Sequence, residues 1–390
     1  MMKLLVDCMP LSTGGGVQVA IAFLDGLSRR RDIDWSAVLP AGMKSVMPAN
    51  LVADGRRITF LAKSSLVDIL RANRCLHAIV QADNPDVVFT VFGPAYFKAN
   101  APHLVGFALP NLIYDRDGVL HRDFRAIDRI ADFARRAMVR WADYFVVETE
   151  TVRHRLAKGL GIDDTRISVI GNSVNPLLER HPPEPVPASG RFGILVPSAY
   201  YRHKNLEILP EIAALLVRHA PGLDFEFRLT LDPTSAPWKR LTEAAAQRSV
   251  ADRLTTLGVL PLDQLARAYR EASAVLLPTL REASTAVYPE SFHFRRPLLT
   301  SDLDFAHELC GGAALYADPA SPADFAGQLA RIAAEQGLAA ELVDKGVIRL
   351  ATTYPTPEQK FEQQLALLAR VARLHGYETG SDGRRSEGDR

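Results

Sequence analysis

Two glutamates in the second half of the chain, Glu282 and Glu290, are separated by seven residues and have strand-like apolar runs on both sides, at 274–278 and 297–300. Glu282 would then follow the carboxyl end of a strand, where open α/β sheets bind their ligands. Pro289 suits the first position of a helix, which would place Glu290 in the first helical turn, whose amides can receive a phosphate. One carboxylate near a polyol, a second further back and backbone donors between them suit a nucleotide-sugar.

The spacing of this glutamate pair has a plain alternative explanation. A chain of this length contains about one such pair by chance, and two solvated glutamates on helix surfaces would then be the correct interpretation. The order of a strand, a loop, a helix start and a second strand around the pair favours a site.

A cluster of basic side chains, Arg202, His203 and Lys204, follows the first predicted strand of the second half, in the segment P-S-A-Y-Y-R-H-K-N-L (197–206). Up to three cations there would neutralise a leaving diphosphate without a metal ion. Asn205 is predicted to cap the next helix. The alternative is solvated surface charge.

A glycine-rich loop, T-G-G-G-V (13–17), lies between the first predicted strand and the first predicted helix. Glycines let a backbone approach a ligand closely, and a helix start attracts anions. Because the loop does not match G-x-G-x-x-G, a dinucleotide site is disfavoured, and a plain flexible turn is the alternative.

The composition allows two domains and disfavours several classes of protein. The chain has 390 residues, 47% of them hydrophobic, and a formal net charge of +1, which argues against a dedicated nucleic-acid-binding protein. Cys8, Cys75 and Cys310 lack metal-ligand spacing and are expected to be reduced thiols of a cytoplasmic protein. The first residues do not have the pattern of a signal peptide, and no apolar run is long enough to span a membrane.

Short apolar runs alternate with helical patterns in both halves of the chain, which predicts βαβ units and two α/β domains facing each other across a cleft. A Pro-rich stretch, H-P-P-E-P-V-P-A-S-G, interrupts the pattern and is typical of a linker. The expected parts are a domain over 1–178, a linker over 179–190, a domain over 191–355, a C-terminal helix over 356–376 that crosses back to the first domain, and a disordered tail over 377–390.

Together, the glycine loop, H-K-N-L and E-x7-E resemble the motifs of family 4 retaining glycosyltransferases of the GT-B fold, which have two Rossmann-like domains. I-S-V-I-G-N-S-V-N (167–175) is similar to the family's stretch before the linker. The segment 301–319 is similar to the part after the second glutamate in bacterial surface-polysaccharide enzymes, such as those of capsule and lipopolysaccharide O-antigen synthesis.

The resemblance implies a role for each matched residue. Glu290 would hold the ribose hydroxyls of the donor nucleotide, Glu282 the hydroxyls of the transferred sugar, and Lys204 the donor phosphates. Backbone amides would complete the donor site, at Ser284, Thr285, Ala286 and Val287, with Gly15 and Gly16 from the first domain. Enzymes of this type are similar in needing no bound metal or other cofactor.

The chain departs from the family pattern at three places. The family often has an arginine where this chain has Ala199, and whether Arg202 replaces it stays open. Ser284 and Thr285 stand where the family commonly has F-G. A histidine that many members carry in the first domain is absent, and Asn111 is the nearest candidate, with Asp115 and His121 as alternatives.

An arginine-rich amphipathic helix is predicted over 122–141. Such a helix can lie on an anionic membrane or receive an acceptor diphosphate; the alternative is a solvated helix whose apolar stripe faces the core and whose aspartates pair with its arginines.

The leading hypothesis is a retaining transfer of a sugar from a nucleotide-sugar to a glycan or a lipid-linked glycan in bacterial surface polysaccharide synthesis. We expect the protein in the cytoplasm, with peripheral contact to the inner face of the membrane. A nucleotide-sugar epimerase of the same fold and a non-catalytic sugar-binding protein are the alternatives.

Overall fold

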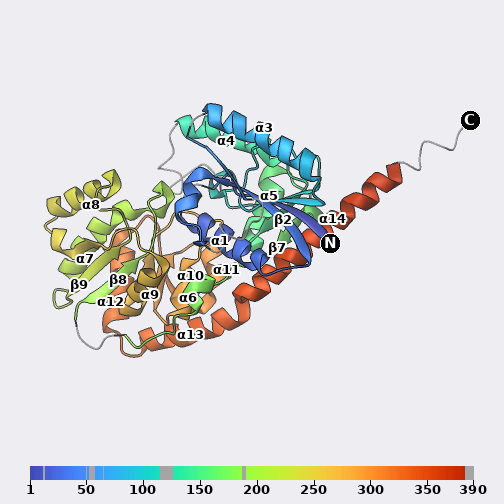
Figure 1. The fold of residues 1–390 in the computed structure, drawn as a ribbon. Helices are drawn as coiled ribbons and strands as arrows, with labels where there is room; N and C mark the ends of the chain where they lie inside the picture. Colours follow the sequence, from blue (N-terminus) through green and yellow to red (C-terminus); the bar gives the residue numbers. More distant parts are fainter. Residues whose placement is uncertain are drawn as a thin grey trace, which may run out of the picture. The chain divides into compact units, whose positions relative to one another are not determined.

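The computed structural model describes residues 1–11, 14–49, 51, 58–64, 66–114, 126–186 and 190–382 (Figure 1). The described chain divides into two compact units. Unit 1 holds the described residues of Met1–Ile113 and Ala126–Gly171 and the helix from Pro357 to Asp382, and unit 2 holds Tyr114 and the described part of Asn172–Thr356. Each unit has its own parallel sheet with helices, so the predicted pair of α/β domains is confirmed.

In the described part of unit 1, seven strands form a sheet in the order β3-β2-β1-β4-β5-β6-β7. The strands are β1 (Met2–Asp7), β2 (Ile33–Pro40), β3 (Ile58–Leu61), β4 (Val87–Thr90), β5 (His103–Gly106), β6 (Tyr144–Val147) and β7 (Ile167–Val169). The helices are α1 (Gly15–Ser28), α3 (Leu66–Asp83), α4 (Ala126–Val139), α5 (Glu150–Leu160) and α14 (Pro357–Asp382), with the short η2 (Pro110–Leu112) before α4.

In the described part of unit 2, six strands form a sheet in the order β10-β9-β8-β11-β12-β13. The strands are β8 (Phe192–Val196), β9 (Phe225–Leu229), β10 (Leu254–Thr256), β11 (Ala274–Leu277), β12 (Leu298–Ser301) and β13 (Ala314–Ala317). The helices are α6 (Pro176–Glu179), α7 (Leu209–His219), α8 (Ala236–Gln247), α9 (Leu262–Glu271), α10 (Val287–His293), α11 (Asp304–Cys310), α12 (Pro322–Ala334) and α13 (Leu338–Thr353), with the short η5 (Arg202–Lys204) after β8.

The central strands are apolar because helices cover both faces of each sheet. Every residue of β4, β5, β11 and β12 is buried. Half-exposed strands alternate apolar and polar side chains with a period of two. These four strands lack that alternation, and the sequence shows mostly apolar runs in their place.

The C-terminal helix α14 packs on unit 1. Phe361 lies against α1 at Gly26, where a Cβ atom would come within 2.7 Å of the phenyl ring. Lys360 Nζ donates to Glu148 Oε1 at 2.6 Å, and both side chains are largely buried. The helix runs to Asp382, so the predicted tail begins too early; residues 383–390 lie outside the described chain.

The Pro-rich stretch differs from the predicted linker. Its described part lies in unit 2, and the units divide at Gly171 instead of residue 178. The buried Arg296 guanidinium donates to Glu184 O at 2.7 Å, and His293 Nε2 donates to His181 O at 2.9 Å. These bonds hold the stretch on unit 2, which a count of prolines does not reveal.

Two local expectations about helix starts are wrong. The helix expected from Asn205 begins only at Leu209, because Asn205 adopts a left-handed conformation with φ 56°. Its side-chain amide donates to Pro319 O at 3.1 Å and caps no helix. Pro289 is the third residue of α10, although Glu290 still lies in the first turn.

Candidate functional site

The predicted site residues of unit 2 gather at the carboxyl ends of β8 and β11. These two strands are neighbours at the centre of the sheet, and the strand order reverses between them. Such a reversal opens a crevice beyond the strand ends, which is where ligands bind in open α/β sheets. The segment after β8 carries Lys204, and the loop after β11 carries Glu282.

Glu282 and Lys204 form an ion pair although 78 positions separate them, with Lys204 Nζ 2.5 Å from Glu282 Oε1. The Thr279 hydroxyl also lies 3.0 Å from Oε1, and the Tyr114 hydroxyl donates to the backbone oxygen of Glu282 at 3.0 Å. Both side-chain contacts use Oε1, so among the described residues no hydrogen bond occupies Oε2. The carboxylate is therefore held in place with one oxygen left for a ligand hydroxyl.

His203 does not supply the third cation that the sequence predicted. Its ring stacks on Tyr201, with 5.5 Å between ring centres, and its backbone oxygen accepts a hydrogen bond from Leu280 N at 2.7 Å. Removal from water, and then the nearby charges of Lys204 and Arg281, hold the pKa of His203 well below its usual range. The imidazole is therefore neutral at pH 7.

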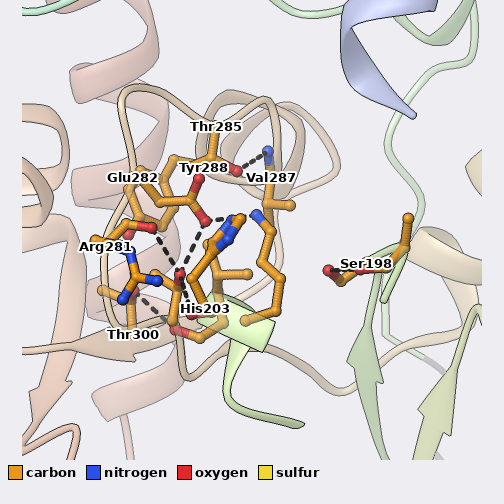
Figure 2. Close-up of polar contacts among 12 residues, drawn as sticks. Ser198, His203, Arg281, Glu282, Thr285, Val287, Tyr288 and Thr300 are labelled. Carbon is orange, nitrogen blue, oxygen red and sulfur yellow. Dashed lines mark hydrogen bonds and ion pairs between the residues drawn. The ribbon is translucent and has the colours of Figure 1, made fainter. Parts of the chain in front are cut away.

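Arg281 is a member of this cluster that the sequence reasoning missed. Its side chain is 2% exposed, and burying a charge is costly without compensating contacts. Figure 2 shows the side chains of His203, Arg281, Glu282 and Thr285 gathered together, with Ser198 apart from them. The only signal in the sequence was its position beside Glu282.

The segment 284–287 has backbone amides that donate no hydrogen bond within the described chain. Among the described residues, the amides of Ser284, Thr285 and Ala286 donate no hydrogen bond. The amide of Val287 differs, because it donates to the Thr285 hydroxyl at 3.3 Å (Figure 2). Three amides therefore remain for a ligand, where four were expected.

Glu290 lies on α10, buried at 7% exposure, and its Oε2 accepts a hydrogen bond from the Tyr269 hydroxyl at 2.8 Å. Burial raises the pKa of Glu290 from 4.5 to about 7, although the Tyr269 bond opposes the shift. The Tyr269 ring stacks on Phe294, with 5.1 Å between ring centres. Tyr269 comes from α9, so no spacing in the sequence links it to Glu290.

Three predicted site residues belong to unit 1. Gly15 and Gly16 begin α1, and a Cβ atom at Gly16 would meet Leu11 at 3.1 Å and Phe92 at 3.3 Å. Asn111 lies in η2 and is partly exposed. The alternatives at 115 and 121, and Thr13 of the glycine loop, lie outside the described residues.

No group of three or more His, Cys, Asp or Glu side chains in the described part of the chain is arranged to hold a metal ion. No described helix is long and apolar enough to cross a membrane.

Comparison with known proteins identifies the family. The model of Glycosyltransferase Family 4 matches residues 13–176, and the model of Glycosyl transferases group 1 matches residues 191–335. A D-inositol 3-phosphate glycosyltransferase of Acidothermus cellulolyticus is 27% identical over 216 residues, which cover 52% of this chain and 48% of the relative. The chain thus matches less than half of this curated relative's length.

Solved structures share the fold across almost the whole chain. A sucrose-phosphate synthase from Thermosynechococcus elongatus superposes with a TM-score of 0.74 at 15% identity, covering 95% of this chain and 99% of that one. Anabaena Alr3699/HepE, solved in complex with UDP-glucose, gives a TM-score of 0.71 at 14% identity, covering 95% and 100%. From its two family matches and its fold, the chain belongs to the family 4 glycosyltransferases of the GT-B fold.

Proposed function

We propose that the protein transfers a sugar from a nucleotide-sugar donor, with retention of the anomeric configuration, to a glycan or lipid-linked glycan in bacterial surface polysaccharide synthesis. The observation that carries the proposal is the Lys204–Glu282 pair at the reversal point of the unit 2 sheet, together with the buried Glu290 on α10. The pair joins a cation for phosphate to a carboxylate for sugar hydroxyls. The complex of Anabaena HepE with UDP-glucose makes UDP-sugars the first donors to test.

In this reaction the bond between the anomeric carbon and the diphosphate oxygen breaks, and a bond forms from that carbon to an acceptor hydroxyl oxygen. The acceptor proton leaves with the nucleoside diphosphate. Because negative charge develops on the leaving diphosphate, cations fixed beside it lower the barrier. Lys204 and the exposed Arg202 have this role in the proposal, while Glu282 Oε2 binds the sugar and Glu290 Oε1 the ribose.

We also propose that no metal ion takes part. Lys204, Arg202 and Arg281 bring three positive side chains to the segments that follow two neighbouring strands, β8 and β11. Charge-assisted hydrogen bonds from such groups stabilise phosphate oxygens. Release of nucleoside diphosphate should therefore persist in EDTA. Loss of release that manganese or magnesium restores would refute this part.

The test of the main proposal is release of free nucleoside diphosphate from UDP-, GDP- and dTDP-sugars, with and without lipid-linked glycan acceptors. Lys204→Ala should slow release strongly, whereas Lys239→Ala, which alters an exposed lysine of α8, should not. Conversion of the sugar without release would indicate an epimerase. Binding without either reaction would indicate a sugar-binding protein, and both results would overturn the proposal.

The anomeric configuration of the product is read by NMR, and inversion would refute the retaining mechanism. We place the protein in the cytoplasm, with peripheral contact to the inner face of the membrane, because the proposed acceptor is lipid-linked.

A further inference from the structure

Helix α4 presents apolar side chains outward from unit 1. Ile130 is 73% exposed and Phe133 is 76% exposed, and Ala134 and Ala137 are exposed as well. Positions i, i+3, i+4 and i+7 lie on one face of a helix. These four residues, hereafter the apolar face of α4, form a continuous stripe on the helix labelled in Figure 1.

The opposite face of α4 carries one polar contact within the helix and one to the rest of unit 1. Asp132 is fully buried, and its Oδ1 accepts a hydrogen bond from Arg135 Nη1 at 2.9 Å. Arg136 Nη2 donates to Leu112 O at 2.9 Å, and Val139 is buried. A helix on the surface of a soluble protein has the reverse arrangement, with its apolar stripe toward the core.

This orientation contradicts one part of the alternative that the sequence left open for this helix. In the described part of the helix, the apolar stripe does not face the core. The pairing of Asp132 with Arg135 agrees with the aspartate–arginine pairs of that alternative, whereas Arg136 bonds to Leu112 O outside the helix.

The residues that border the apolar face indicate what covers it. Arg140 is exposed one turn beyond Ala137, and the side chain of Arg135 is 42% exposed beside its bond to Asp132. Trp141, partly exposed, follows on the same side of the helix. Apolar side chains bordered by arginines and a tryptophan are typical of helices that lie in the interface of an anionic bilayer.

A second copy of the chain fits this surface less well. A stable protein interface buries roughly 800 Å² on each partner, and an aromatic side chain supplies about 150–250 Å². The apolar face has two large side chains, Ile130 and Phe133, followed by Ala134 and Ala137. Shallow insertion into lipid does not require a larger matching surface.

We propose that the apolar face of α4 inserts into the surface of an anionic lipid bilayer, with Arg140 contacting the lipid headgroups. The inference rests on the proposed function in one respect: lipid binding would bring the enzyme to a lipid-linked acceptor. Binding to lipid itself does not depend on sugar transfer.

The test is flotation of the full chain with vesicles of phosphatidylcholine alone and of phosphatidylcholine with 30% phosphatidylglycerol. The wild-type protein should float with the anionic vesicles and be released by high salt, because the arginine contribution is screened. The double substitution Ile130→Ser and Phe133→Ser should reduce the bound fraction at least tenfold. Ile348→Ser is the matched control, since Ile348 is 63% exposed but lies on α13 in unit 2, and it should float like wild type.

Circular dichroism and the melting temperature should match between wild type and the double variant, because both side chains are exposed. Absence of wild-type flotation at low salt would overturn the proposal, as would a double variant that floats like wild type. A wild-type dimer that the double substitution dissociates, without flotation, would identify a second copy as the occupant.

The outcome is separable from that of the proposed function. Nucleoside diphosphate release with a soluble glycan acceptor should be the same in the double variant and wild type. If the wild type floats but no nucleotide-sugar donor releases diphosphate, the proposal that α4 binds lipid is supported and the transferase proposal fails.

Discussion

The ionisation of Glu290 gives the most specific prediction for donor binding. The carboxylate is buried beside the Tyr269 hydroxyl, and burial raises its pKa to about 7 in the ligand-free protein. A charged carboxylate accepts hydrogen bonds from ribose hydroxyls more strongly than the neutral acid does. Donor affinity should therefore rise as the pH increases through 7.

The expected change follows from the fraction of protein in the ionised form. With a pKa of about 7, that fraction is about 9% at pH 6 and about 91% at pH 8. If only the ionised form binds, the apparent dissociation constant is inversely proportional to this fraction and should fall about tenfold between these pH values. A tenfold change corresponds to about 1.4 kcal/mol of binding free energy.

Calorimetric titration with an unreactive nucleotide-sugar at pH 6, 7 and 8 measures this change. A nucleotide-sugar is preferable to a free nucleoside diphosphate, because its diphosphate is esterified at both ends. It therefore lacks the terminal phosphate group that ionises at about pH 6 and would add its own pH dependence. Glu290→Gln should bind weakly with no pH dependence from this group. Tyr269→Phe should move the midpoint to higher pH, since the tyrosine bond lowers the pKa of Glu290. Wild-type affinity independent of pH, or the same slope in Glu290→Gln, would refute the reasoning.

Three further changes have expected outcomes. Glu282→Gln should lower kcat about 10- to 150-fold while UDP affinity changes little, because a hydrogen bond to a charged group contributes about 1.5–3 kcal/mol; unchanged turnover would contradict the site assignment. Gly106→Ala should destabilise unit 1 by about 1–3 kcal/mol in chemical denaturation, because the added Cβ atom would lie 1.9 Å from Val91 O. Gly159→Ala on α5 is the control: its Cβ atom would have nothing within 4 Å, so it should not destabilise the unit. Burial raises the pKa of Asp7 from 3.8 to about 6, so the contribution of Asp7 to the unfolding free energy should fall by about 3 kcal/mol as the pH rises from 3.8 to 6 and stay lower above it. The difference between the pH curves of wild type and Asp7→Asn measures this contribution, and parallel curves would count against it.

The sequence alone determined the order of most of the elements that carry the site. The strand-like runs at 274–278 and 297–300 correspond within one residue to β11 (Ala274–Leu277) and β12 (Leu298–Ser301). The edge strands β3 and β13 were not predicted. β11 and β12 are just as short, but β3 and β13 lie at the edges of their sheets, where partly exposed residues weaken the continuous apolar pattern of a buried strand.

The sequence also placed Glu282 after a strand and Glu290 in the first turn of a helix, because both positions depend on neighbours within a few residues. Strand and helix patterns are local, since side-chain periods of 2 and 3.6 are set by backbone geometry. For the same reason, the motifs that resemble the family could be read along the chain without knowledge of its packing.

Only the tertiary structure decided the charges and contacts of these residues. It brought Lys204 to Glu282 across 78 positions and Tyr269 to Glu290, left His203 neutral, buried Arg281, and turned the apolar face of α4 outward. Burial and pKa depend on which elements pack together, and those elements come from distant parts of the chain. A local pattern therefore specifies that a helix or strand forms, while the packing of the whole unit determines what its side chains can do.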